Sequence, residues 1–214
     1  RISGAVRLPV VITSVGEDAH RVDALLDIGS DARLADGASQ LSGAQPDAVM
    51  WACTSGSFVF GPQGARAQAA AVADAAGVPA SSTSIAFVDA LRHLGIRRVA
   101  VAASYPDDVA QHFVGFLTDG GAEVVSMGSH GIYTAAEVGT LEPSRVVDMV
   151  TAADHPDAEA VLVPDTAMHT LAIIDQLEAA VGKPVLTANQ VTMWHSLSLI
   201  GRKAVGPGQQ LMER

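Results

Sequence analysis

Residues 47–57 have the sequence Asp-Ala-Val-Met-Trp-Ala-Cys-Thr-Ser-Gly-Ser, an apolar run followed by a small polar turn. Residues 159–167, Glu-Ala-Val-Leu-Val-Pro-Asp-Thr-Ala, repeat this order. The repetition predicts two buried strands, each followed by a polar turn that opens a helix. In a parallel sheet such turns lie at the carboxyl ends of the strands, where α/β proteins bind ligands. The alignment makes Cys53 and Asp165 equivalent, and we expect them to face each other across a cleft.

Along the rest of the chain, short apolar runs alternate with longer segments of helical period, which is typical of an α/β fold with a parallel sheet. The predicted strands are 8–15, 48–52, 98–103, 122–126, 160–163 and 184–186. The predicted helices are 18–30, 64–76, 84–94, 107–119, 142–153, 170–181 and 190–199. Because no linker rich in Pro, Ser or charge interrupts the pattern, we expect one α/β body.

The composition excludes several classes of protein. The chain has 214 residues, is 49% apolar, and carries 13 Lys and Arg against 23 Asp and Glu, a formal net charge of −10. It lacks the clustered cations that a nucleic-acid surface requires. It also lacks an apolar run of the roughly 18 residues that a membrane span needs. The first residue is Arg1 rather than Met, which leaves room for residues upstream.

The cysteine and histidine content limits the chemistry further. Cys53 is the only cysteine, which excludes an intramolecular disulfide and a four-cysteine zinc site and favours a reducing, cytoplasmic compartment. The seven histidines show no HExxH or similar spacing, so we predict no metal. Neither GxGxxG nor the P-loop signature occurs, so we predict no nucleotide cofactor.

The turn at 53–57 offers a thiol at a strand end, hydroxyls, and a glycine that permits close backbone approach. Free N–H groups at the start of the next helix favour a bound carboxylate and a thiolate. A lone cysteine in this position is as often a small buried hydrophobe. Asp165 is equally well explained as the cap of a helix beginning near Thr170. Tyr105 and Asn189 follow two other predicted strands and are placed to line the same cleft.

Three segments together resemble the aspartate/glutamate racemase superfamily, in particular its maleate cis-trans isomerase and arylmalonate decarboxylase branch. They are the turn at 53–57, the Ser104-Tyr105 turn and the run 171–201, within which 174–178, 182–190 and 194–195 are especially similar. The resemblance implies two pseudo-symmetric lobes, each a mainly parallel sheet flanked by helices, with the active-site cleft between them. The first lobe would comprise residues 1–94 with 190–214, and the second residues 95–189. The resemblance also implies chemistry on small carboxylates without a cofactor.

Two features depart from that family. It usually carries a second cysteine where this chain has Asp165, and an additional N-terminal strand that this sequence does not show. With ordinary pKa values of about 8.5 for Cys and about 3.9 for Asp, the two groups differ too much in basicity for symmetric racemisation. The resemblance therefore implies the role of a family cysteine for Cys53, whereas Asp165 matches the family in position only.

From this resemblance we expect an isomerase that acts on a small carboxylate or dicarboxylate, similar to maleate cis-trans isomerases. The Cys53 thiolate would add to the double bond of the diacid, and a protonated Asp165 would deliver and recover a proton on the other side. The predicted substrate-binding residues are Thr54, Ser55, Gly56 and Ser57 for one carboxylate, Tyr105 and Thr166 for the other, and Asn189.

Other functions stay open. One alternative is a decarboxylase of a substituted malonate, although in the resembling decarboxylases the proton-donating cysteine belongs to the turn that here holds Asp165. An amino-acid racemase-like enzyme and a non-catalytic carboxylate-binding protein are further alternatives. A slow, unprotected reaction of Cys53 with alkylating reagents would favour the binding protein. The weakly charged, apolar composition also allows a homo-oligomer.

Overall fold

The computed structural model describes residues 6–204 and 210–213. Its strands are β1 (Val49–Trp51), β2 (Ala80–Ser82), β3 (Arg98–Ala103), β4 (Glu123–Ser129), β5 (Ala160–Val163) and β6 (Val185–Thr187). Its helices are α1 (Val22–Ile28), α2 (Asp31–Leu41), α3 (Ser55–Phe58), α4 (Gly61–Ala76), α5 (Thr83–Leu94), α6 (Asp107–Asp119), α7 (Ala135–Val138), α8 (Pro143–Ala153), α9 (Ile174–Val181), α10 (Ala188–Leu199) and α11 (Gln210–Glu213), with a 3-10 turn at Ser42–Ala44.

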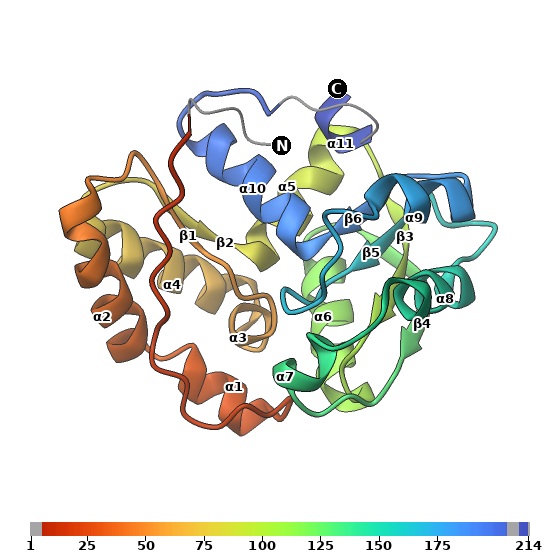
Figure 1. The fold of residues 1–214 in the computed structure, drawn as a ribbon, viewed down its shortest axis with the longest axis horizontal. Coiled ribbons are helices and arrows are strands. Elements are labelled where there is room, and N and C mark those ends of the chain that lie inside the picture. The colour runs from red at the N-terminus through yellow and green to blue at the C-terminus, as the bar shows by residue number, and fades with distance from the viewer. Residues whose placement is uncertain (1–5, 205–209, 214) are drawn as a thin grey trace.

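The described strands form two parallel sheets, which confirms the predicted α/β fold. The smaller sheet has the order β1-β2 and the larger one the order β4-β3-β5-β6. In Figure 1 the smaller sheet lies with α1 to α4 in one half of the molecule, and the larger sheet lies with α6 to α9 in the other. Helices α5 and α10 pack against each other between the halves.

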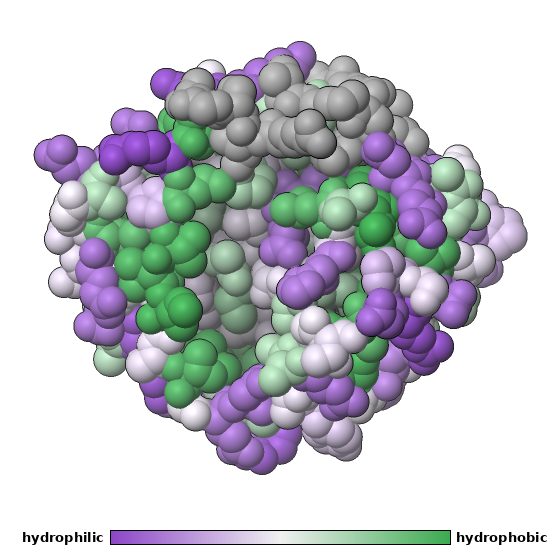
Figure 2. All heavy atoms as spheres, in the orientation of Figure 1, coloured by the Kyte–Doolittle hydropathy of each residue, from purple (hydrophilic) through white to green (hydrophobic). Residues whose placement is uncertain are grey.

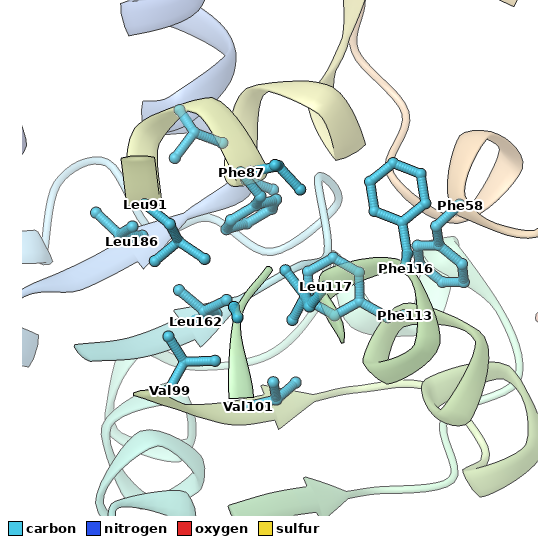
Figure 3. Close-up of a cluster of buried hydrophobic side chains, with 14 of the residues drawn as sticks. Phe58, Phe87, Leu91, Val99, Val101, Phe113, Phe116, Leu117, Leu162 and Leu186 are labelled. Carbon is cyan, nitrogen blue, oxygen red and sulfur yellow. The ribbon is translucent and has the colours of Figure 1, made fainter. Parts of the chain in front are cut away.

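β3 and β5 lie where the sequence predicts them, because their residues are buried on both faces of the larger sheet. Alternate residues point to opposite faces of a strand. Val99, Val101 and Leu162 accordingly join Phe87 and other residues in one hydrophobic cluster, drawn in Figure 3. Ala100, Val161 and Val163 join a second cluster on the other face, with residues of α8 and α9. The β5 turn is therefore held on a rigid central strand.

The larger cluster also contains Phe58 of α3 and Leu91 of α5. One core thus reaches from the turn after β1 to the strands of the larger sheet, and it fixes the two halves relative to each other. The division into residues 1–94 with 190–214 and residues 95–189 stays a prediction, and its positions 1–5, 205–209 and 214 lie outside the described residues.

The strand predicted over 8–15 is wrong. Residues 6–15 are extended but belong to neither sheet, and Val10 and Ile12 are 83% and 84% exposed. The alternation of apolar and polar residues fits a strand, but only pairing with another strand would make it one. Instead, Arg33 of α2 holds the segment from the side, donating to the carbonyl and hydroxyl of Ser14 at 2.8 Å each.

Other boundaries differ in ways that matter less for the site. The helix predicted over 18–30 is confined to α1, and the one predicted over 170–181 begins only at Ile174. The sequence did not predict β2, whose three residues are small, or α2, whose interior contains Gly37. It also missed the four-residue helices α3 and α7.

Candidate active site

The turns after β1 and β5 meet at one cavity of about 680 Å³ between the two halves of the molecule. Cys53 and Ser55 line it from the first turn, and Asp165 and Thr166 line it from the second. His20, from the segment before α1, lines the same space. The two aligned strand ends therefore contribute to a single cavity, as parallel strands in this arrangement require.

The surroundings of Cys53 act on its thiol in opposite directions. Burial raises the pKa of the Cys53 thiol, and the charge of Asp165 adds to this rise. Hydrogen bonding from the Gly56 backbone and the Ser55 side chain lowers the same pKa, but by less. The net direction is upward, so at neutral pH Cys53 carries its proton and can donate it.

Gly56 makes the close packing around the sulfur possible. A Cβ atom at this position would lie 3.2 Å from Cys53 Sγ and 2.8 Å from the Cη2 atom of Trp51. Both distances are shorter than ordinary contacts, which begin near 3.5 Å between carbon atoms. The close backbone approach predicted for this glycine is therefore visible in the packing of the turn.

Asp165 is 4% exposed and both of its carboxylate oxygens are engaged. Oδ2 accepts a hydrogen bond of 2.5 Å from the hydroxyl of Ser104, which follows β3. Oδ1 accepts the backbone N–H of Ala167 at 2.9 Å. Asp165 does not cap a helix near Thr170, because α9 begins at Ile174. Its carboxylate closes the turn after β5 instead.

His20 is a site residue that the sequence did not reveal. It is 4% exposed, and its ring lies edge-on to Tyr105 with the centroids 4.9 Å apart. Nδ1 lies 2.7 Å from the carbonyl oxygen of Ile132, and Nε2 lies 3.9 Å from Asp165 Oδ2. These partners are 112 and 145 positions away in the chain, so no local spacing could have indicated them.

Two of the predicted substrate-binding residues contact the backbone of the Asp165 turn. Tyr105 is fully buried and donates its phenol proton to the carbonyl of Pro164 at 3.0 Å. Burial, with the charges of Asp165 and Cys53, raises its pKa well above the ordinary range, so this proton stays in place. Asn189 donates its side-chain amide to the carbonyls of Thr166 and Met168, at 3.0 and 3.2 Å. In this conformation both residues hold the turn in position.

The four predicted residues of the first turn separate into two groups. Ser55 faces the cavity, and Gly56 packs beneath the thiol. The hydroxyl of Ser57 is hydrogen-bonded to that of Ser82 at 2.8 Å in the interior. The carbonyl of Thr54 accepts the Ser84 hydroxyl at 2.7 Å, and Thr54 is buried as well. Neither Thr54 nor Ser57 lines the cavity, and their assignment to substrate stays a prediction.

Away from the two turns the cavity lining is mostly apolar, with Thr13 and Asp18 as its polar members. Among the described residues that line it, none is Lys or Arg, and thirteen are large hydrophobic side chains or proline: Pro9, Val10, Val11, Ile12, Val15, Leu25, Ile28, Leu34, Leu41, Val49, Met50, Trp51 and Val72. Figure 2 shows the hollow, with hydrophobic atoms along its left side where segment 6–15 passes in Figure 1. The cavity thus has a polar end at the two turns and an apolar end against α2 and β1.

Within residues 6–204 and 210–213, no group of three or more His, Cys, Asp or Glu side chains is arranged to hold a metal ion. No helix in the same part of the chain has the length and apolarity needed to cross a membrane.

Comparison with known proteins gives a consistent set of relatives. A family model described as arylmalonate decarboxylase matches residues 28–212. Arylmalonate decarboxylase from Bordetella bronchiseptica is 31% identical over 150 residues, which cover 69% of this chain and 62% of that protein. Maleate isomerase from Geobacillus stearothermophilus is 28% identical over 176 residues, covering 79% and 70%. The aligned part thus spans less than two thirds of the first of these relatives.

Solved structures agree with the sequence relatives. A liganded double mutant of arylmalonate decarboxylase, with one glycine changed to cysteine and one cysteine to serine, has a TM-score of 0.84 at 28% identity. The match covers 93% of this chain and 86% of that one. The maleate isomerase of Pseudomonas putida S16 has a TM-score of 0.85 at 23% identity, covering 92% and 81%, which shows the shared fold.

Proposed function

The chain belongs to the arylmalonate decarboxylase family, and from that premise we propose that it decarboxylates a malonic acid bearing an apolar substituent, with Cys53 as the proton donor. The observation that carries this proposal is the division of the cavity. Its polar end holds Cys53, Ser55, Asp165 and Thr166, whereas its other end is lined by aliphatic and aromatic side chains. A substrate with a carboxylate group at one end and an apolar group at the other fits both.

The apolar end of the cavity favours a decarboxylase substrate with an apolar substituent over maleate, the substrate of the isomerase relatives. Maleate has two carboxylates and no apolar substituent, so it would leave the aliphatic lining uncovered. A phenyl substituent that buries about 100 Å² there would gain about 2.5 kcal/mol. That corresponds to an affinity difference of about 70-fold. The sequence favoured a maleate isomerase-like reaction, and the apolar lining is the reason to place the decarboxylase first.

The reaction needs few parts. A malonate carboxylate that is moved from water into an apolar cavity is destabilised relative to neutral CO₂. The C–C bond to that carboxylate breaks, CO₂ leaves, and the electron pair stays on the α-carbon as an enediolate of the remaining carboxylate. Ser55 and Thr166 line the polar end of the cavity, and in this reaction their hydroxyls would donate hydrogen bonds to the oxygens of the enediolate. The α-carbon then takes the proton from Cys53, leaving a thiolate.

The electrostatics of Cys53 support a donor role. An ordinary thiol with a pKa of about 8.5 is about 3% ionised at pH 7. Because burial and Asp165 raise the pKa of Cys53, its ionised fraction is smaller still. A nucleophile that adds to a double bond needs the thiolate, whereas protonation of an enediolate needs the thiol.

A second candidate is cis-trans isomerisation of an unsaturated diacid by addition of Cys53 to the double bond. The favouring observation is that Ser55 and the Gly56 backbone both stabilise a charged sulfur. A maleate cis-trans isomerase of this fold from Nocardia farcinica, a cysteine-to-serine mutant, carries a covalently bound succinylcysteine. In this case the Cys53 thiol would have to lose its proton when the substrate binds, because only the thiolate adds to the double bond.

The experiment measures CO₂ release from phenyl-substituted malonates and fumarate formation from maleate, with wild type, Cys53→Ala and the exposed control His169→Gln. We expect CO₂ release that Cys53→Ala lowers by at least about 10²-fold and that His169→Gln leaves unchanged. Undiminished CO₂ release in Cys53→Ala would refute the role of the thiol. Cysteine-dependent fumarate formation alone would favour the second candidate, and carboxylate binding without turnover would favour a non-catalytic binding protein.

A further inference from the structure

The cavity is lined by acidic rather than basic side chains. Among the described residues of its lining, Asp18 and Asp165 carry carboxylates, His20 carries an imidazole, and none is Lys or Arg. Asp18 accepts the backbone N–H groups of Ala135 and Ala136 at 2.8 and 3.0 Å, at the start of α7. Asp165 belongs to the polar end, which it shares with the thiol of the proposed reaction. A ligand at this end therefore meets a carboxylate, and no lysine or arginine of the described lining.

Asp165 can accept further hydrogen bonds. A carboxylate offers about four lone-pair sites on its two oxygens. Ser104 donates to Oδ2 and the backbone N–H of Ala167 donates to Oδ1, so that each oxygen keeps a free lone pair. His20 Nε2 lies 3.9 Å from Oδ2, which is too long for a hydrogen bond. The carboxylate is thus held in place by two donors and still has acceptor capacity toward the cavity that it lines.

The charge of Asp165 acts on the groups near it. Besides burial, it raises the pKa values of the Cys53 thiol and the Tyr105 phenol, because one negative charge disfavours a second one nearby. A carboxylate that a substrate keeps beside Cys53 would meet the same repulsion. A neutral group with N–H bonds would instead donate to Asp165, and hydrogen bonds to a charged acceptor are about twice as strong as those between neutral groups.

We propose that Asp165 is a specificity-determining residue, and that the group which the substrate retains is a carboxamide rather than a second carboxylate. The substrate is then the monoamide of a malonic acid with an apolar substituent, an inference that rests on the proposed function. The amide N–H donates to Asp165, and the amide oxygen accepts from the hydroxyls of Ser55 and Thr166, which line the same end. The single carboxylate is the group that leaves.

The monoamide undergoes the proposed reaction with less buried charge. The C–C bond to the carboxylate breaks, CO₂ leaves, and the electron pair forms the enolate of the amide. The α-carbon takes the proton of Cys53, and the thiolate regains a proton from water. The enolate of an amide carries one negative charge, whereas the enediolate of a carboxylate carries two. This difference matters beside Asp165, because like charges repel more strongly in a site of low dielectric constant than in water.

The first experiment measures binding without turnover, as protection of Cys53 from iodoacetamide by phenylacetamide and by phenylacetate. Wild type should be half-protected by phenylacetamide at a concentration about 10-fold or more lower, which is the effect of one hydrogen bond to a charged group. In Asp165→Asn, whose side-chain amide can donate to a carboxylate, the ratio should fall to about one or invert. The exposed control His169→Gln should keep the wild-type ratio. Each rate is divided by that of the same variant without ligand, so a changed reactivity of the thiol cancels.

Two results would overturn the role of Asp165. One is equal or stronger protection of wild type by phenylacetate, a comparison that depends on the folding of no variant. The other is a preference for phenylacetamide that persists in Asp165→Asn when its thermal unfolding matches wild type. Protection by neither compound would contradict the occupation of the cavity that both proposals require.

The second experiment compares CO₂ release from the monoamide of phenylmalonic acid with that from phenylmalonate. We expect kcat/KM of wild type to be about 10-fold or more higher for the monoamide, and Asp165→Asn to lose this advantage. The two proposals fail in different ways. A higher kcat/KM for phenylmalonate would refute the selection of an amide and retain the decarboxylase. Preferential protection by phenylacetamide, with CO₂ release from neither compound, would do the reverse.

Discussion

Replacing Gly56 by alanine tests whether the packing of the first turn sets the position of the Cys53 thiol. The added Cβ would lie 2.8 and 3.1 Å from Cη2 and Cζ2 of Trp51, and 3.2 Å from Cys53 Sγ. To regain a normal carbon–carbon contact of about 3.5 Å, the indole ring must withdraw by about 0.7 Å. The sulfur must also move by a few tenths of an ångström.

The two effects differ in size. Overpacking of this kind costs about 1–3 kcal/mol, offset by about 0.5–1 kcal/mol because alanine restricts the unfolded chain. A net loss near 1 kcal/mol lowers Tm by about 2–4 °C. A 1 Å misplacement of a reacting group costs about 10²-fold in rate, so a few tenths should lower turnover by about 3- to 10-fold. Activity should therefore fall more clearly than stability.

The assays are thermal unfolding, CO₂ release and the alkylation rate of Cys53. Gly115→Ala is the matched control, because Gly115 is exposed in the middle of α6 and a Cβ there meets nothing within 4 Å. It should raise stability by about 0.5–1 kcal/mol without changing activity. If Gly56→Ala behaved like this control, with activity and alkylation unchanged, the packing around the thiol would have no role.

Three further predictions concern the same turns. Asn189→Ala removes the hydrogen-bond donors of the Thr166 and Met168 carbonyls. The free energy of unfolding, measured with denaturant, should fall by about 1–3 kcal/mol, and KM should rise. An unchanged KM would mean that substrate binding does not depend on this support of the turn. Tyr105→Phe leaves the buried Pro164 carbonyl without its donor and should lower Tm by about 2–8 °C, and equal Tm values would exclude that contribution. In wild type, alkylation of Cys53 should be slow at pH 7 and increase beyond pH 8.5, since its pKa is raised; fast alkylation at pH 6 would contradict a protonated thiol.

The parts of the fold and of the candidate site that depend on runs of neighbouring residues could be predicted from the sequence. β3 and β5 are predicted correctly because continuous runs of small and β-branched apolar residues suit a strand that is buried on both faces. The turn at Cys53 and the one at Asp165 follow from the strand ends, and the structure brings both to one cavity. Segment 8–15 shows where pattern alone fails, because its alternation is that of a strand but it pairs with none in the described structure.

The residues that the sequence missed depend on long-range contacts. His20 reaches Ile132 and Asp165 only after the chain has folded, and nothing around it in the sequence marks it. Asp165 resembles a helix cap, but its carboxylate bonds to Ser104 from another strand end and to the N–H of Ala167. Tyr105 and Asn189 follow predicted strands as expected, yet their hydrogen bonds go to the backbone of the Asp165 turn.

Protection of Cys53 from alkylation tests the account most directly, because it measures occupation of the cavity without requiring turnover. Cys53 should be protected by a phenyl-substituted carboxylate at a concentration about 70-fold lower than by maleate, since only the former covers the apolar end. Equal protection by both, stronger protection by maleate, or no protection at all would contradict the assignment of this cavity to a carboxylate with an apolar substituent.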